Sequence, residues 1–145
     1  MTTKTPREGK KRVRVIIDSN AFFVPLRFRI DIFEELRRLL NAKPQLILLS
    51  AAQKELEKLR EKGSPKMRRE ADFALRFAEK CTLYSTEEMS ERSADDVIVE
   101  IAGRWKSPVF TNDRELRKRL RDINVPVIYV KQKSHLATEG MIQPV

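Results

Sequence analysis

Four acidic residues stand out because three lie at or shortly after a short apolar run and the fourth, Asp95, lies just before one, in the first turn of an expected helix. Asp18 ends the run "VRVII", Glu55 follows "LILL" in "SAAQKELEKL", Asp95 lies in "SADDVIVEIA", and Asp113 follows "VF" in "VFTNDREL". Carboxylate oxygens without histidine or cysteine suit a hard divalent cation such as Mg²⁺ or Mn²⁺. Such an ion lowers the pKa of a bound water and neutralises charge on a phosphate. The pattern therefore indicates metal-assisted hydrolysis at a phosphate.

Each acid also has a purely structural explanation. Asp113 could cap a helix, Asp95 and Asp96 could favour the positive end of a helix dipole, and Glu55 could belong to a solvated face. Asp96 has capping-box spacing from Ser93, which leaves Asp95 as the functional candidate of that pair. If all four acids converge at about 4–5 Å, each pair repels by roughly 3–4 kcal/mol at an effective dielectric near 20. Convergence would therefore require a cation among them.

The acids must be positioned by short buried strands. Apolar runs that do not alternate with polar residues are typical of parallel strands buried on both faces. They occur at Val13–Ile17, Leu46–Leu49, Val109–Phe110 and Val127–Val130, with a weaker candidate at Thr82–Tyr84. Amphipathic helical patterns separate them. We therefore predict a three-layer α/β/α sandwich with a central parallel sheet of four or five strands, whose carboxyl ends carry the acids.

Helix starts are marked by serines. Ser50 and Ser93 have capping-box spacing to Gln53 and Asp96, and Ser64 precedes a proline at the first helical position. We expect a helix N-cap at each of these three serines.

Length and composition indicate one intracellular domain. The chain has 145 residues, one cysteine (Cys81) and one histidine (His135), which exclude an internal disulfide and a structural zinc site. No apolar run approaches the ~18 residues of a membrane span. We expect a basic N-terminal tail at residues 1–12, one domain at residues 13–130, a C-terminal tail at residues 131–145, no membrane association and a cytoplasmic location.

The charge balance favours a polyanionic partner. A net charge of +9 suits nucleic acid, because phosphate contacts release counterions, although a heavily charged surface is the alternative. Two other chemistries fit poorly. An aspartyl phosphatase needs a second aspartate where Asn20 stands, and a nucleotide-dependent enzyme needs a glycine-rich phosphate loop that these four glycines do not form.

The acid motifs resemble those of the PIN-domain nucleases. The resemblance lies in "IIDSN", "QKELEKL", "ADD" and "TND", and spans about residues 13–130. The stretches "SADDVIVEIAGRWKSPVFTNDRELRKRL" and "VPVIYV" are most similar to the branch that processes small-subunit ribosomal RNA. The resemblance implies a PIN-like fold, RNA cleavage, pairing as a homodimer, and one or two Mg²⁺ or Mn²⁺ ions held by Asp18, Glu55, Asp95 and Asp113.

Supporting roles follow from the same resemblance. It implies that four polar residues orient acids, water or phosphate: Ser19, Asn20, Thr111 and Asn112. Their alternative roles are those of turn and cap residues. Helical spacing groups Arg114, Arg117 and Arg121 on one face that could bind RNA, with a solvated surface as the alternative. Phe22, Phe23 and Phe28 could stack on bases, although packing in a core or dimer interface is favoured.

The leading hypothesis is a metal-dependent endoribonuclease that acts on a ribosomal RNA precursor. Three alternatives stay open: a ribonuclease toxin of a VapC-type toxin–antitoxin pair, a non-catalytic RNA-binding assembly factor, and a nuclease directed at DNA.

Overall fold

The computed structural model describes residues 12–142, which form a six-stranded sheet between two layers of helices. Apart from Arg12, the predicted N-terminal tail lies outside these residues. The strands are β1 (Arg12–Ile17), β2 (Lys43–Leu49), β3 (Thr82–Tyr84), β4 (Val109–Phe110), β5 (Val127–Lys131) and β6 (His135–Glu139). Their order in the sheet is β3-β2-β1-β4-β5-β6, and every pair is parallel except β5 with β6. The predicted α/β/α fold class is confirmed, and the sheet has six strands, one of them antiparallel, where four or five parallel strands were predicted.

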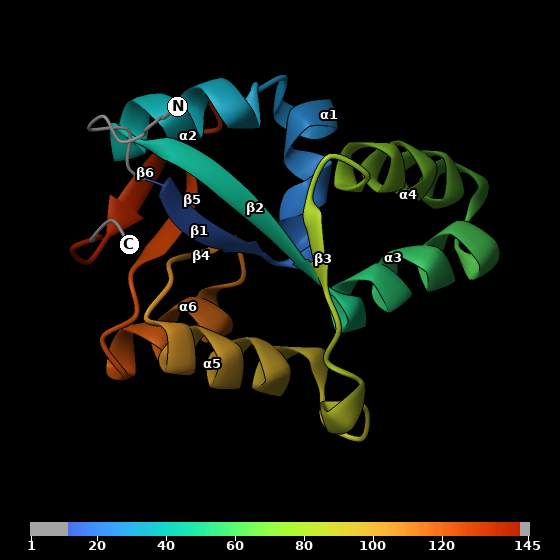
Figure 1. Cartoon of the computed structure of the whole chain (residues 1–145). Helices are drawn as coiled ribbons and strands as arrows, with labels where there is room; N and C mark the ends of the chain where they lie inside the picture. The colour runs from blue at the N-terminus through green and yellow to red at the C-terminus, as the bar shows by residue number, and fades with distance from the viewer. Residues whose placement is uncertain (1–11, 143–145) are drawn as a thin grey trace, which may run out of the picture.

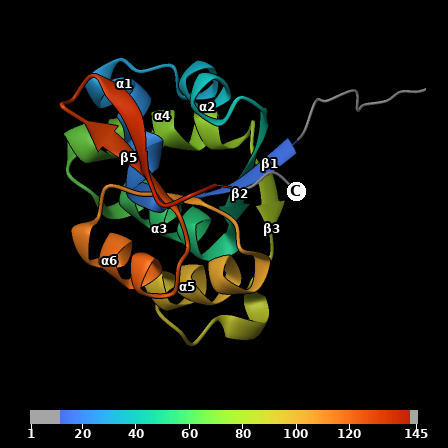
Figure 2. The ribbon, with the colours of Figure 1, turned by 90° about the vertical axis from the view of Figure 1, so that its left-hand side faces the viewer.

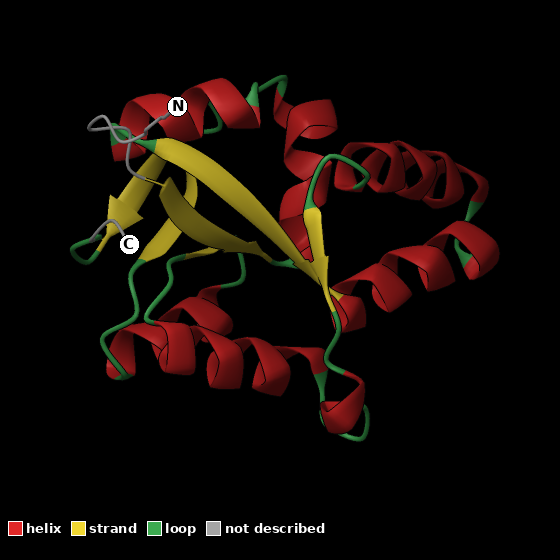
Figure 3. Cartoon of the chain, in the orientation of Figure 1, coloured by secondary structure: helices red, strands yellow, loops and turns green. Residues whose placement is uncertain are grey.

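The helices follow the predicted alternation with the strands. They are the 3₁₀ helix η2 (Ser19–Phe23), α1 (Val24–Phe28), α2 (Ile32–Leu40), α3 (Ser50–Lys62), α4 (Pro65–Ala78), the 3₁₀ helix η3 (Glu87–Met89), α5 (Ala94–Trp105) and α6 (Arg114–Asp122). Figure 1 shows α5 and α6 on one side of the sheet and α1 and α2 on the other, and Figure 2 shows the same layers from the side. In Figure 3, the α3–α4 hairpin extends away from the strands.

Two hydrophobic cores form because successive strand residues point to opposite faces of the sheet. In β1, Val13, Val15 and Ile17 belong to the core shared with α2, α3 and α4, whereas Ile16 belongs to the core shared with α5 and α6. Burial on both faces explains why these strands are continuously apolar. The carboxyl-terminal halves of β1 and β2 are therefore closed to solvent on both faces, whereas the amino-terminal halves carry the partly exposed Arg14 and Gln45.

The C-terminal boundary predicted at residue 130 divides a hairpin. Residues 135–139 form β6, which pairs antiparallel with β5 and is part of the folded domain, so the tail assignment is wrong for this segment. Leu136 is buried in the core, and its N–H donates to Glu35 Oε1 at 3.1 Å. The strand is hard to recognise because only this one of its five residues is buried.

The predicted helix caps are found at two of three serines. Ser64 accepts a hydrogen bond from Met67 N–H, and Ser93 accepts one from Asp96 N–H. The cap predicted at Ser50 is wrong, because Leu49 holds the N-cap position and the Ser50 hydroxyl bonds to Thr86 instead. Within residues 12–142, none of the helices combines the length and apolar character that crossing a membrane requires.

Candidate active site at the carboxyl edge of the sheet

Asp18 is a buried carboxylate at the end of the central strand β1. Only 4% of its surface is exposed. Its Oδ1 accepts the backbone N–H of Ser19 at 2.8 Å, and its Oδ2 accepts the hydroxyl of Thr111 at 2.6 Å. The pKa of Asp18 is raised to about 6: burial is the largest cause, the charges of Asp95 and Glu55 add to the rise, and the two hydrogen bonds oppose it. A carboxyl in these conditions is poised to bind a cation.

The sheet register explains why Asp18 and Thr111 meet. Ile17 of β1 lies opposite Phe110 of β4, so the residues that follow these strands are neighbours. The Thr111 hydroxyl also accepts the backbone N–H of Asp113 at 3.1 Å. One buried threonine thus connects the acid after β1 to the acid after β4.

Asp113 caps α6 as well as bordering the site. Its Oδ1 accepts the backbone N–H groups of Glu115 and Leu116 at 2.9 and 3.2 Å. The structural explanation for this acid is therefore correct. Because these bonds involve only Oδ1, a functional role for Oδ2 is compatible with the cap.

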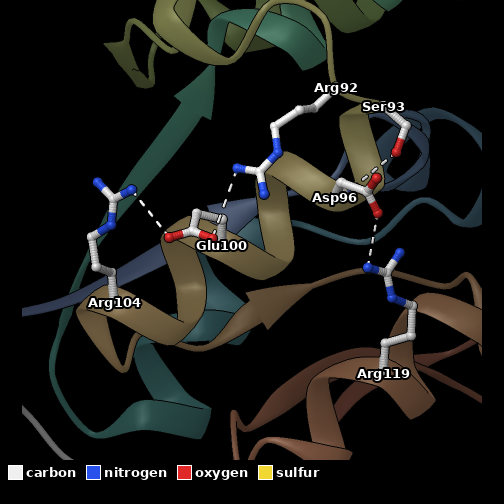
Figure 4. A network of polar contacts seen from close by, with 6 residues as sticks. All are labelled: Arg92, Ser93, Asp96, Glu100, Arg104 and Arg119. Atoms are coloured by element: carbon white, nitrogen blue, oxygen red, sulfur yellow. Dashed lines mark hydrogen bonds and ion pairs between the residues drawn. The ribbon is translucent and has the colours of Figure 1, made fainter.

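Asp95 and Asp96 have different surroundings at the start of α5. Ser93 caps the helix by accepting the backbone N–H of Asp96, and Asp96 Oδ1 accepts a hydrogen bond from Arg119 Nη2 at 2.8 Å, as Figure 4 shows. These interactions lower the pKa of Asp96, with the Arg119 hydrogen bond as the largest cause. Burial raises the pKa of Asp95, and the charge of Asp113 raises it further. The Asp96 side chain is engaged in an ion pair with Arg119, and Asp95 is the member of the pair that interacts with the other site acids.

The electrostatic effects link all four predicted acids. Asp95 and the exposed Glu55 act on Asp18, and Asp113 acts on Asp95. Glu115 also raises the pKa of Asp95. This fifth acid was not singled out from the sequence, although it follows Asp113 by two residues in "TNDREL".

The site fits a divalent ion by donor type and by charge. Its candidate ligands are carboxylate oxygens whose mutual repulsion a cation would relieve. Across residues 12–142, no three acidic, histidine or cysteine side chains are grouped closely enough to hold one ion. Side-chain rotation, for which the exposed Glu55 has most freedom, is therefore needed to bring three carboxylates onto one ion.

Two asparagines fix the loop that carries Thr111 and Asp113. Asn20 Oδ1 accepts the N–H of Asn112 at 3.3 Å, and Asn112 Oδ1 accepts the N–H of Val130 at 3.0 Å. The loop between β4 and α6 is thereby connected to both η2 and β5. Of the four predicted supporting residues, Asn20, Thr111 and Asn112 hold backbone in place with their side chains, and Ser19 contributes its N–H.

A basic groove of about 890 Å³ begins beside this loop. Asn112 and all three predicted arginines (Arg114, Arg117 and Arg121) line it. Arg121 also donates to the carbonyl of Val125 at 3.3 Å. Sequence reasoning missed eight further lining residues, among them Lys118 of α6, Tyr129 and Lys131 of β5, and Lys133 of the β5–β6 turn, because none of these positions has a distinct signal in the sequence. The three arginines therefore form part of a larger basic surface.

The aromatic residues near the first acid divide between core and groove. Phe22 and Phe23 are buried, so the favoured core explanation holds for both. Phe28 is half-buried and lines the groove. Only Phe28 of the three is accessible to a bound molecule.

Comparisons with known proteins agree with this geometry. Residues 15–133 match the family described as "PIN like domain". Ribonuclease VapC4 of Methanocaldococcus jannaschii is 28% identical over 130 residues, which cover 89% of this chain and 98% of that protein. Ribonuclease VapC9 of Archaeoglobus fulgidus is 26% identical over 133 residues, which cover 92% and 93%.

A solved structure is similar over nearly the whole chain. The PIN domain endonuclease Utp24 superimposes with a TM-score of 0.75 and 32% sequence identity, and the match covers 91% of this chain and 95% of that one.

Proposed function

Because this chain belongs to the PIN-like domain family, we propose that it is a divalent-metal-dependent endoribonuclease. One observation carries the proposal: at the carboxyl edge of the sheet, Thr111 joins the buried Asp18 to the backbone of Asp113, and the charges of Asp95 and Glu55 act on Asp18. Open parallel sheets bind ligands at this edge. The relatives named as ribonucleases and the endonuclease Utp24 support the same activity.

Asp18, Glu55, Asp95 and Asp113 would hold the Mg²⁺ or Mn²⁺ ion. When bound, such an ion lowers the pKa of a water molecule and offsets charge on a phosphate. Asp18 would be the fixed ligand, because burial and two hydrogen bonds restrict it. Glu55, which is exposed, would adjust to the ion. In the overall reaction, a water oxygen bonds to phosphorus, the bond to the leaving oxygen breaks, and that oxygen takes up a proton.

The basic groove would bind the RNA strand on one side of the cleaved bond. It is continuous with the loop of Thr111 and Asp113 through Asn112 and Arg114. Its cationic side chains offset the repulsion between an acidic site and a polyanion. The groove and the acids together support RNA rather than a small phosphate ester as the substrate.

Cleavage assays test the activity directly. The purified protein should cut RNA with Mg²⁺ or Mn²⁺ and should lose this activity in excess chelator and as Asp18→Asn. Parallel assays on DNA of matched sequence separate the two nucleic acids. Metal-independent cleavage, or full activity of Asp18→Asn, would contradict the proposal.

Two biological roles have support from different relatives. We propose maturation of a ribosomal RNA precursor as the leading role, since the motifs resemble those of the branch that processes small-subunit ribosomal RNA and the structural similarity to the PIN domain endonuclease Utp24 supports an endonuclease. The VapC4 and VapC9 similarities support a toxin as the second candidate. Crosslinking Asp18→Asn to RNA in cells, followed by sequencing, would identify the target. Growth arrest on expression that a neighbouring gene relieves would favour the toxin.

Three further expectations stay predictions. A homodimer would be detected by light scattering of the purified protein, and a cytoplasmic location by cell fractionation. The non-catalytic assembly role predicts that a strain carrying Asp18→Asn processes RNA normally. The complete set of acids favours an active enzyme over that alternative.

A further inference from the structure

Arg117 is held in a fixed position inside the basic groove by two partners. Its guanidinium lies over the ring of Tyr129 at 4.0 Å from the centroid, and its Nε donates to Glu139 Oε1 at 3.1 Å. Tyr129 occupies one face of the planar guanidinium, and Glu139 bonds to its edge. Neither partner uses the second face, and 34% of the side chain is exposed.

The charged side chains of the groove fall into two groups, which suit different parts of an RNA strand. Arg117 already has an anionic partner in Glu139, which reduces its value for capturing a phosphate. In the part of the chain that the structure describes, no ion pair involves Arg114, Lys118, Lys131 or Lys133, which line the same groove. These four cations suit the phosphates of a strand, whereas a flat and partly neutralised guanidinium suits the face of a base.

We propose that Arg117, Tyr129 and Glu139 form a seat on which one unpaired RNA base stacks. The base would lie on the second face of the Arg117 guanidinium and extend the Arg117–Tyr129 stack by one layer. A base paired within a helix is already stacked on both faces, so this seat selects single-stranded RNA. The inference rests on the proposed function, since it concerns the substrate of the same groove.

The seat is prepared before RNA arrives. Tyr129 and Glu139 come from the paired strands β5 and β6, and Arg117 comes from α6, so three elements fix its geometry. Because these side chains are already ordered, they lose little conformational entropy when RNA binds, and this favours affinity. Asn112 and Arg114 line the same groove, so the stacked base would lie near the loop that carries Thr111 and Asp113.

Binding assays without cleavage test the seat. A fluorescently labelled oligo(A) RNA of about twelve nucleotides, a length within the usual range for single-strand sites, is compared with an abasic ribose-phosphate strand of equal length. Chelator is present throughout. Arg117→Lys keeps the positive charge and removes the planar surface. Lys118→Gln is the matched control, because it removes a charge from the same groove and leaves the stack intact.

The proposal predicts opposite patterns for the two variants. Arg117→Lys should weaken oligo(A) binding by about 5- to 100-fold, the range for one base–aromatic stack, and should leave binding of the abasic strand within twofold. Lys118→Gln should weaken both strands by the same factor. Tyr129→Leu, which removes the ring beneath Arg117, should repeat the Arg117→Lys pattern.

Two results would overturn the seat. In one, Arg117→Lys weakens both strands equally, so that Arg117 is a phosphate contact. In the other, folded Arg117→Lys and Tyr129→Leu proteins bind oligo(A) as the wild type does. Both results are measured by binding alone and do not depend on catalysis. If the wild-type protein proves inactive, that result counts against the proposed function, whereas the binding data still decide whether the stacking site exists.

Discussion

The hydroxyl of Thr111 donates to Asp18 Oδ2 at 2.6 Å, although 93 residues separate them in the sequence. The same oxygen accepts the N–H of Asp113. A single side chain thereby fixes the distance between the acid after β1 and the acid after β4. The site is therefore rigid at its buried end, where Asp18 lies, and adjustable at its exposed end, where Glu55 lies.

Replacing Thr111 with valine should weaken this connection. The substitution is close in size and removes both hydrogen bonds, which leaves Oδ2 of the buried Asp18 carboxylate and the backbone N–H of Asp113 without these partners. We expect the free energy of unfolding to fall by about 1.5–3 kcal/mol and the pKa of Asp18 to rise further, since the Thr111 bond lowers it. Urea denaturation measures the first effect and NMR titration of the carboxyl the second.

Thr111→Ser is the matched control, because it keeps the hydroxyl. It should retain the wild-type pKa of Asp18, whereas equal pKa values in the valine and serine variants would show that the hydrogen bond has no electrostatic role.

Asp18 should destabilise the metal-free protein at neutral pH. Its folded pKa is about 6, above the ordinary value of 3.8, so the folded state favours the protonated carboxyl. Stability is then unaffected below pH 3.8, declines as the pH rises between about 4 and 6, and is lower by about 3 kcal/mol above that range. In chelator at pH 7.5, Asp18→Asn should melt at a higher temperature than the wild type. At pH 4 the difference should disappear.

Adding Mn²⁺ should reverse this order at pH 7.5. A bound ion stabilises the wild type by binding the folded state only, whereas Asp18→Asn lacks the carboxylate that we propose as its fixed ligand. A Mn²⁺-induced rise in melting temperature of equal size in both proteins would contradict the role of Asp18 as a ligand.

Asp95 and Asp96 should respond differently to the same chemical change. Asp95→Asn should abolish cleavage and reduce the melting shift produced by Mn²⁺. Asp96→Asn should keep cleavage within a few-fold of the wild type, since Asp96 bonds to Arg119 at the exposed surface. Cleavage rates of the two variants under one set of conditions decide the assignment. If Asp96→Asn lowered the cleavage rate more than Asp95→Asn, Asp96 rather than Asp95 would be the functional acid.

The salt dependence of RNA binding should show which cationic side chains of the groove contact RNA phosphates. For a single strand, each phosphate contact contributes about 0.7 to the slope of log affinity against log salt concentration. Lys133→Gln should therefore reduce the slope by about 0.7. Lys80→Gln is the control, because Lys80 does not line the groove. An unchanged slope for Lys133→Gln would remove that residue from the RNA interface.

The β6 strand should be necessary for stability. Leu136 is 3% exposed and packs in the core, so Leu136→Ala should lower the free energy of unfolding by about 2–5 kcal/mol. Thr138→Ala changes an exposed side chain of the same strand and should have little effect. Chemical denaturation compares the two, and equal stabilities would mean that β6 is only loosely attached.

Features that depend on neighbours in the sequence could be predicted. Continuous apolar runs indicated β1, β2, β4 and β5, because burial on both faces leaves no alternation. The positions of Asp18 and Asp113 at strand ends followed from the same runs. The spacing of Ser93 and Asp96 indicated the cap and separated Asp95 from its neighbour. Each of these signals is contained within a few residues.

Features that depend on distant partners could not be predicted. Ser50 has the sequence spacing of a cap, but its hydroxyl forms hydrogen bonds with Thr86, 36 residues away. Glu115 influences Asp95 only because α6 packs beside α5. No local pattern reports such contacts, because they depend on how the helices pack.

By itself, the sequence determined the layered α/β fold and the acids at its strand ends, because hydrophobic periodicity and capping are local properties of the chain. Only the tertiary structure decided which partner each polar group has. The pairing of β5 with β6 brings Glu139 to Arg117, 22 residues away. That contact depends on strand register and helix packing, which no short stretch of sequence encodes.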